Sequence, residues 1–308
     1  MSSFSTFPNH GYDIKFSPFQ ADILTVATSE NFGFSGAGAL LVLKVDPAGG
    51  SQLLTEKKWR SNLFCATWCT SDRILTGSVD GSVQIWSLND PECSESFIAH
   101  QGEISSVECV RNAVLTASWD QTLKLYDLTT KTCVNQFRGH QDIIYRAKLC
   151  DNGIISVSAD KTLKLWSSRA PHCLASIQVH DSEVLCCDWN QNDPNLIATS
   201  GSDSLIRVWD LRHLRQPAFQ LKGGNQAVKN VKFSPHFLYI LGSSSFDGST
   251  SVWDIRRGAP LEVFRKHSGF VYGLDWSEFE LGLLCDCAWD SFVQVFWSNA
   301  VKTLRNKI

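Results

Sequence analysis

The sequence predicts an all-β fold, a single seven-bladed β-propeller over residues 1–308 with four antiparallel strands per blade. Three observations lead to this prediction. Aspartates recur every 40 to 44 residues, an aromatic residue follows each of them by six positions, and short β-rich runs separated by polar turns fill the intervals. Internal periods of this length are typical of propeller blades, because each blade buries its faces only against its neighbours.

The periodic residues form a signature in fixed register. The aspartates are Asp80, Asp120, Asp160, Asp203, Asp247 and Asp290, and the aromatics six positions later are Trp86, Tyr126, Trp166, Trp209, Trp253 and Phe296. His100, His140, His180 and His267 precede their aspartates by 20 or 23 residues, and Gly223 and Gly224 stand near the place of a sixth-repeat histidine. These are the marks of WD repeats.

We interpret this signature as a structural network. An Asp in the turn between the second and third strands can accept a hydrogen bond from the His, and a hydroxyl such as that of Ser118 and an indole such as that of Trp166 can continue the chain. A buried network of this kind is favourable only when every polar group has a partner.

The third repeat shows the expected blade most clearly. Its four strands are predicted over Ile104–Val110, Ala113–Ser118, Thr122–Asp127 and Thr132–Phe137, with polar or glycine-containing turns between them. No helical stretch in the sequence is long enough to compete with this assignment.

The first blade lacks the Asp and Trp signature. Its presence is indicated by Ile14–Pro18, which repeats the pattern of Val231–Pro235, and its remaining strands are expected at 23–27, 39–45 and 51–56. Seven blades then span residues 9–297 and leave the last blade one strand short. Either residues 3–8 or residues 301–304 must complete it, and the N-terminal segment is expected because closure by both chain ends removes an open sheet edge.

Composition excludes several classes of protein. No apolar run approaches the ~18 residues that cross a bilayer, so no membrane insertion is expected. The segment 1–10 has no leader pattern, which predicts a cytosolic protein. The net charge of −3 argues against a nucleic-acid partner. The eleven cysteines lack zinc or redox spacing, and we expect them to be reduced and mostly buried.

Catalysis, cofactors and metals are not expected either. Ser, His and Asp recur in every repeat, whereas a catalytic constellation occurs once around one pocket. The glycines of Gly33–Gly38 lack the Lys and Ser/Thr of a phosphate-binding loop. The repeat histidines belong to different blades, which separates them too far to share a metal ion.

A propeller usually binds its partners on the face formed by the loops that enter the first strand and join the second to the third. Positions three and five after each His, and the position before each Asp, supply eighteen residues there, of which seven are aromatic. Exposed aromatic clusters are typical of interfaces, although any one ring can simply cover the blade packing beneath it. The candidate peptide-binding residues are Phe64, Glu103, Trp119, Ile143, Tyr145, Glu183, Phe246, Phe270, Tyr272 and Trp289. Such a face suits a short amphipathic helix with aliphatic anchors and a basic residue.

Specific stretches carry a family resemblance. The opening His10–Phe19, followed by Asn31–Gly33, Gly38 and the Leu40–Leu43 run, resembles the unusual first blade of the peroxin seven family, the WD-repeat receptors for type-2 peroxisomal targeting signals. Further similar stretches are Ser118–Leu125, Phe137–His140 with Ile143–Tyr145, and Leu211–Pro217 running into Phe233–Pro235.

The resemblance implies a cargo receptor of the cytosol that shuttles to the peroxisome. Its partners would be matrix proteins with an N-terminal nonapeptide signal, which begins with a basic and an aliphatic residue and ends with His or Gln and Leu or Ala, together with an import co-receptor. Glu103 matches an acidic position expected to attract the basic residue, and Trp119, Ile143 and Tyr145 are candidates for the apolar side.

One departure from the family concerns the residues around Phe64. Acidic residues are common there in the family, but Ser61 and Cys65 occupy those places in this chain, which predicts a weaker acidic clamp. The alternative function is that of a general interaction scaffold, such as a substrate adaptor of a ubiquitin ligase or a chromatin-associated propeller.

Overall fold

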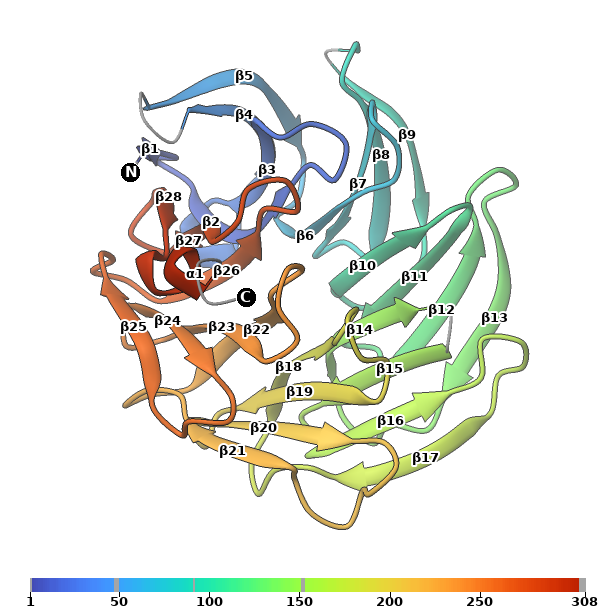
Figure 1. Ribbon diagram of the computed structural model, residues 1–308. Coiled ribbons are helices and arrows are strands. Elements are labelled where there is room, and N and C mark those ends of the chain that lie inside the picture. Colours follow the sequence, from blue (N-terminus) through green and yellow to red (C-terminus); the bar gives the residue numbers. More distant parts are fainter. Residues whose placement is uncertain (1, 47–49, 91, 151–152, 305–308) are drawn as a thin grey trace.

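The computed structural model describes residues 2–46, 50–90, 92–150 and 153–304, and it shows seven four-stranded antiparallel sheets arranged around a central channel (Figure 1). The predicted fold class is therefore confirmed. In each sheet the first strand of the repeat lies innermost and the fourth lies at the circumference.

The blades follow one another in chain order. The first contains β2 (His10–Phe16), β3 (Ile23–Ser29), β4 (Gly38–Asp46) and β5 (Gly50–Trp59). The second contains β6 (Leu63–Trp68), β7 (Arg73–Ser78), β8 (Ser82–Ser87) and β9 (Cys93–Ile98). The third contains β10 (Ile104–Val110), β11 (Ala113–Ser118), β12 (Thr122–Asp127) and β13 (Thr132–Arg138), which matches its predicted strands except for one added residue at the end.

The remaining blades repeat the pattern. The fourth contains β14 (Ile144–Cys150), β15 (Gly153–Ser158), β16 (Thr162–Trp166) and β17 (Cys173–Gln178). The fifth contains β18 (Val184–Trp189), β19 (Leu196–Gly201), β20 (Leu205–Asp210) and β21 (Phe219–Lys222). The sixth contains β22 (Val228–Phe233), β23 (Ile240–Ser245), β24 (Ser249–Asp254) and β25 (Pro260–Arg265). The seventh contains β26 (Val271–Trp276), β27 (Leu283–Ala288) and β28 (Phe292–Trp297), and β1 (Ser2–Ser5) completes it.

Closure of the ring uses the N-terminal segment. β1 pairs antiparallel with β28, from Ser2 opposite Val295 to Ser5 opposite Phe292. The strand is shorter than the predicted segment 3–8 and begins earlier. The C-terminal alternative is wrong, because residues 301–304 belong to helix α1 (Asn299–Leu304), whose Val301 packs against the core of the sixth and seventh blades.

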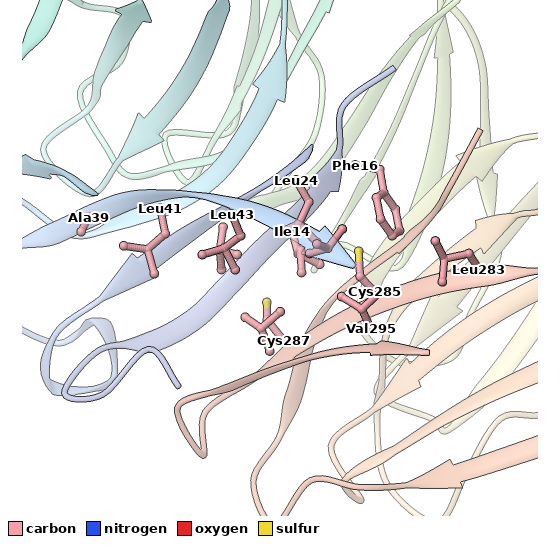
Figure 2. Close-up of a cluster of buried hydrophobic side chains, with 13 residues drawn as sticks. Ile14, Phe16, Leu24, Ala39, Leu41, Leu43, Leu283, Cys285, Cys287 and Val295 are labelled. Carbon is pink, nitrogen blue, oxygen red and sulfur yellow. The ribbon is translucent and has the colours of Figure 1, made fainter. Parts of the chain in front are cut away.

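The hydrophobic core is divided among the interfaces between blades. At the interface between the first and seventh blades, Ile14, Leu24 and Leu43 pack against Cys285 and Val295, and all five are buried (Figure 2). Because each interface joins inner strands that are covered on both faces, the sequences of these strands are apolar nearly throughout rather than alternating.

The predicted Asp–His network is present, but one of its partners was assigned wrongly. His140 Nδ1 lies 2.7 Å from the Asp160 carboxylate, and its Nε2 lies 2.7 Å from the hydroxyl of Ser156, to which the Trp166 indole also donates at 2.8 Å. The hydroxyl thus comes from the position four residues before the Asp. Ser118, two residues before Asp120, instead accepts from the Asp120 amide, because the imidazole extends past the turn to the next hydroxyl on the same face of the strand.

Two of the six signature blades lack the histidine. In the second blade Arg60 donates to Asp80 at 3.3 Å. In the sixth the Asn225 amide donates to Asp247 at 3.1 Å, as the Gln101 amide does to Asp120 beside the histidine of the third blade. His100, His180 and His267 pair with Asp120, Asp203 and Asp290 at 2.8 to 3.0 Å. The indoles of Trp209 and Trp253 donate to the hydroxyls of Thr199 and Ser243.

The expectation of reduced cysteines is wrong for one pair. Cys69 and Cys109 form a disulfide with a Cα–Cα distance of 5.4 Å. They lie 40 residues apart, one blade period, so the propeller places Cys69, the residue after β6, beside Cys109 of β10. Cys65, Cys186, Cys187, Cys285 and Cys287 are buried as expected. No helix within the described ranges is long and apolar enough to cross a membrane.

Candidate functional site

A β-bulge in every innermost strand builds one face of the propeller. In β10 the register passes from Ile104 to Ser106 and leaves Ser105 unpaired, and the other six inner strands skip one residue at the same place. Bulges redirect a side chain out of the ladder. The seven skipped residues are Tyr12, Phe64, Ser105, Tyr145, Leu185, Lys229 and Tyr272, and all of them line one cavity.

This cavity has a volume of about 360 Å³ and opens at the end of the channel where the predicted face lies. Six of the ten predicted binding residues line it, namely Phe64, Glu103, Trp119, Tyr145, Tyr272 and Trp289. Of the other four, Glu183 accepts a hydrogen bond from the Tyr145 hydroxyl at 3.1 Å. Phe246 and Phe270 stack with ring centroids 4.8 Å apart beside Tyr272 and Trp289. Ile143 is half-buried and does not line the cavity.

The aromatic side chains form a continuous arc over five blades. From Phe246 and Phe270 it runs through Tyr272 and Trp289, whose rings stack at 4.7 Å, to Tyr12. Tyr12 stacks on Phe64 at 4.7 Å, and Phe64 lies 6.3 Å from Trp119. Burial raises the pKa of the hydroxyls of Tyr12, Tyr145 and Tyr272 well above the usual range, so these groups stay neutral.

Part of the site comes from the first blade and was missed among the predicted residues. Tyr12, Phe32 and Phe34 line the cavity, and the Phe34 side chain is 87% exposed. The sequence similarity between Ile14–Pro18 and Val231–Pro235 aligns Tyr12 with Lys229. This alignment could have identified Tyr12 as a residue of the face. The loop that carries the two phenylalanines has no counterpart in the other repeats.

The loop between β3 and β4 is held by specific contacts. The Glu30 carboxylate accepts from the Ala37 amide at 2.9 Å, and the Asn62 side chain bonds the Glu30 amide and the Ser35 carbonyl. Gly33 adopts a φ of 75°, where a side chain would collide with Tyr12. Phe32 is thereby placed over His10, with ring centroids 3.8 Å apart.

The expected acidic clamp around Phe64 needs correction at one of its two positions. Cys65 is buried one layer below the face, where its thiol donates to backbone carbonyls of Gly77 and Ile104. Its side chain cannot reach a ligand on the face, because the bulge turns Phe64 outward and the next residue inward. The absence of charge at position 65 therefore does not affect the attraction between this face and a basic ligand.

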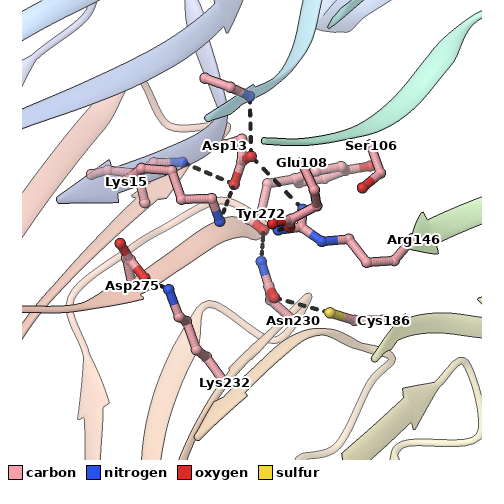
Figure 3. Close-up of polar contacts among 12 residues, drawn as sticks. Asp13, Lys15, Ser106, Glu108, Arg146, Cys186, Asn230, Lys232, Tyr272 and Asp275 are labelled. Atoms are coloured by element: carbon pink, nitrogen blue, oxygen red, sulfur yellow. Dashed lines mark hydrogen bonds and ion pairs between the residues drawn. The ribbon is translucent and has the colours of Figure 1, made fainter. Parts of the chain in front are cut away.

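A network of paired charges lies beneath the cavity (Figure 3). Asp13 contacts Lys15 at 3.2 Å and Arg146 at 3.7 Å, Glu108 contacts Lys148 at 2.9 Å, and Lys232 contacts Asp275. Burial opposes ionisation of Asp13, but the charges of Lys15 and Arg146 outweigh it and hold the pKa of Asp13 below its usual range. Asp13 and Arg146 thus form the floor of the aromatic cavity, and the other paired charges line a second, more polar cavity of about 510 Å³ at the opposite end of the channel.

Within the described residues, no group of three His, Cys, Asp or Glu side chains is placed to hold a metal ion. The repeat histidines are buried inside their own blades and face their aspartates. The arrangement is suited to binding an apolar surface with a polar edge.

Comparisons with known proteins agree with this geometry. The model of the WD domain, G-beta repeat, matches residues 51–87, 91–127, 131–167, 171–210 and 215–254. The chain is 34% identical to the peroxisomal targeting signal 2 receptor of Mus musculus, with 93% of each chain covered. It is 35% identical to the receptor of that name from Homo sapiens, with 86% of this chain and 85% of that protein covered. The solved WD40 β-propeller domain of Doa1 superimposes with a TM-score of 0.82 at 18% identity over 97% of this chain and 96% of that one, a likeness of fold.

Proposed function

Because this chain belongs to the WD-repeat family and, within it, to the peroxisomal targeting signal 2 receptors, we propose that it binds the N-terminal type-2 signal of peroxisomal matrix proteins. It captures these proteins in the cytosol and delivers them, with a co-receptor, to the peroxisomal import machinery. The propeller acts as one domain over residues 1–308 and contributes binding without catalysis.

One observation carries the proposal: the bulges of seven blades and the loops beside them place an aromatic arc and the Glu103 carboxylate around one open cavity. A helix with an apolar stripe bordered by a basic residue is complementary to that surface. Tyr12, Phe64 and Trp119 supply apolar contacts. Glu103, whose backbone carbonyl accepts from the Trp119 amide, and Glu183, which is bonded to Tyr145, supply negative charge.

The expected binding energies assign different roles to the aromatic residues and to the carboxylates. Burial of one aliphatic anchor contributes roughly 1.5 to 3 kcal/mol before ordering costs, whereas an exposed ion pair contributes roughly 0 to 1 kcal/mol. We therefore assign affinity to the aromatic arc and the orientation of the helix to Glu103. Ile143 belongs to the rim of this arrangement, outside the cavity.

A pull-down tests the proposal directly. Full-length protein should retain a type-2 signal peptide and release a scrambled peptide of equal charge. Equal retention of both peptides, or of neither, would contradict a targeting-signal receptor and favour a general interaction scaffold.

Two variants separate the binding face from the framework. Glu103→Lys should weaken signal binding at least about fivefold with little change in the thermal midpoint, because its half-buried carboxylate faces the cavity. Asp120→Ala should lower the midpoint by several degrees, because His100, the Gln101 amide and Thr122 lose their acceptor. Glu56→Lys, on the outer strand β5, is the matched charge reversal and should change neither property. Equal destabilisation by the Glu103 and Asp120 variants would contradict the assignment of Glu103 to the binding face and of Asp120 to the framework.

A further inference from the structure

The disulfide between Cys69 and Cys109 joins the inner strands of the second and third blades at the end opposite to the candidate binding face. Cys69 directly follows β6, and Cys109 lies near the end of β10. Phe64 and Ser105, near the beginnings of the same two strands, line the aromatic cavity. Each strand therefore runs from a residue of the binding face to a cysteine of the disulfide.

Charged side chains join the inner strands at the other six interfaces between blades. In order from the first blade, these contacts are Asp13 with the Ala66 amide, Glu108 with Lys148, Lys148 with Asp188, Asp188 with the Phe233 amide, Lys232 with Asp275, and Asp275 with the Phe16 amide. Three residues after the bulge, β6 has Thr67 where the neighbouring blades have Lys15 and Glu108. No residue of β6 is charged, and the disulfide is what joins this strand to β10.

The second blade is also held less firmly at its own turn. Its aspartate, Asp80, is bonded by Arg60 at 3.3 Å, and the Arg60 side chain is 73% exposed. An exposed ion pair of this kind stabilises a fold little. The sixth blade lacks the histidine as well, but its Lys232 takes part in the charged contacts of the channel. The position of the second blade against the third therefore depends on the disulfide more than any other blade depends on one bond.

The bond is placed where a small thiol can react with it. Both cysteines are half-buried, and Cys109 lines the second cavity, of about 510 Å³, at the opposite end of the channel from the binding face. The proposed function places the receptor in the cytosol, where glutathione keeps thiols reduced and the disulfides that do form are usually transient and redox-sensing.

We infer that Cys69 and Cys109 form a redox modification site, which exchanges with glutathione and thereby sets the affinity of the binding face. The inference rests on the proposed function and adds a means of regulating it.

The exchange balances with glutathione alone. One glutathione thiolate attacks a sulfur of the bond, forms a mixed disulfide and releases the other cysteine, which takes up a proton. A second glutathione thiolate then attacks the glutathione sulfur of the mixed disulfide and releases the remaining cysteine, which is protonated in turn. Two glutathione molecules supply the two electrons and leave as glutathione disulfide, and the reverse reaction closes the bond.

The bond acts on the binding face through β6. The Phe64 ring stacks on Tyr12 and lies 6.3 Å from Trp119 of the third blade, so this aromatic contact crosses the same interface as the disulfide. When the bond opens, Phe64 is no longer fixed relative to Trp119 by a covalent link between the two blades. Ligand binding must then order the pair, which lowers affinity. We therefore expect the oxidised form to bind more tightly.

The test measures the affinity of a fluorescein-labelled type-2 signal peptide by anisotropy in buffers of graded glutathione to glutathione disulfide ratio. Mass spectrometry after alkylation gives the fraction of the Cys69–Cys109 linkage in the same samples. Full-length wild type is compared with the double variant Cys69→Ser, Cys109→Ser, and with Cys133→Ser, a control at an exposed free cysteine.

Oxidised wild type and the oxidised control should bind the peptide at least about fivefold more tightly than their reduced forms, and the change in affinity should coincide with the change in linkage. The double variant should bind like reduced wild type at every ratio. Thermal melts of all three proteins verify that the fold is retained.

Three results would overturn the inference. A bond that stays closed at every ratio would be a permanent structural link, and an affinity that stays constant while the bond opens would show that the binding face is independent of it. A redox response that persists in the double variant would belong to another cysteine. Failure of the proposed function is distinguishable from all three, because a scrambled peptide would then bind as well as the signal in both redox states.

Discussion

A single position decides whether the buried histidine of a blade carries a charge. Four residues before the turn aspartate stand Thr116, Ser156 and Thr199 in three blades, and the imidazole Nε2 meets their hydroxyls. The seventh blade has Asp286 there, and its carboxylate lies 2.9 Å from His267 Nε2. One imidazole thus lies between two carboxylates.

The charge state follows from these partners. For His100 and His140, burial outweighs the single aspartate and lowers the pKa, so these imidazoles are neutral at pH 7. For His267, burial is outweighed by the hydrogen bonds to Asp286 and Asp290, which raise the pKa to about 9. His267 is therefore an imidazolium that holds the seventh blade together at neutral pH.

We expect a pH-dependent contribution of His267 to stability. Its pKa is higher in the folded chain than the ordinary value of 6.5, so its contribution is complete below pH 6.5 and is lost as the pH rises towards 9. The free energy of unfolding from urea titrations should fall by ~3 kcal/mol over that interval from this group. Asp286→Thr, which reproduces the third blade, should remove this slope, and NMR should show the His267 titration moving below pH 7. An unchanged slope in that variant would contradict the assignment.

At the scale of elements, the inner strands explain why the face could be predicted in part. The histidine spacing located Ser105, Tyr145, Leu185 and Tyr272, because the position five after the histidine is the bulged one, and the equivalent positions of the two signature repeats without the histidine gave Phe64 and Lys229. The bulge itself leaves no signal in composition, since the skipped residues range from serine to tyrosine. Cys65 was consequently placed on the face, although the bulge turns it into the interior.

Contacts that depend on the reach of a side chain were harder to anticipate than the strands. The hydroxyl partner of the histidine was assigned two residues too late, and the Cys69–Cys109 bridge was not expected. Both depend on how far a side chain reaches across a twisted sheet, which periodicity does not encode. The strands of the third repeat, by contrast, follow directly from local alternation and turn residues.

The N-terminal strand should be necessary for ring closure. Ser2 is buried, Phe4 packs against the core between the first and seventh blades, and the Thr6 amide donates to the Ser291 carbonyl at 2.8 Å. Deletion of residues 1–8 should lower the thermal midpoint by several degrees and promote association, because the edge of β28 becomes free to pair with another chain.

A synthetic peptide of residues 1–8 should restore much of that stability by strand complementation. Ser3→Thr, which keeps the strand and its exposed position, serves as the control. Calorimetry and light scattering measure both properties. A truncated chain that stays monomeric and melts at the wild-type temperature would show that β1 is not needed to close the ring.

At the scale of the whole molecule, charge is distributed so that the framework is neutral and one edge of the face is not. The channel cations Lys15, Lys148 and Lys232 are paired with acids, and the net charge of the chain is −3. Glu103 lines the open cavity, and Glu183 accepts a hydrogen bond from Tyr145 beside it. The apolar arc acts only after contact, whereas these carboxylates act at a distance.

This separation predicts that salt changes the rate of association more than the rate of dissociation. The screening length falls from roughly 10 Å at 0.1 M salt to roughly 3 Å at 1 M. Over that range, stopped-flow measurements should show the association rate constant of a basic signal peptide falling several-fold, with the dissociation rate constant nearly constant, because buried apolar contacts set the residence time. Glu103→Gln should reduce the salt dependence of association. If salt instead accelerated dissociation and left association unchanged, the ion pairs rather than the aromatic arc would hold the bound helix, and the division of roles across the face would be reversed.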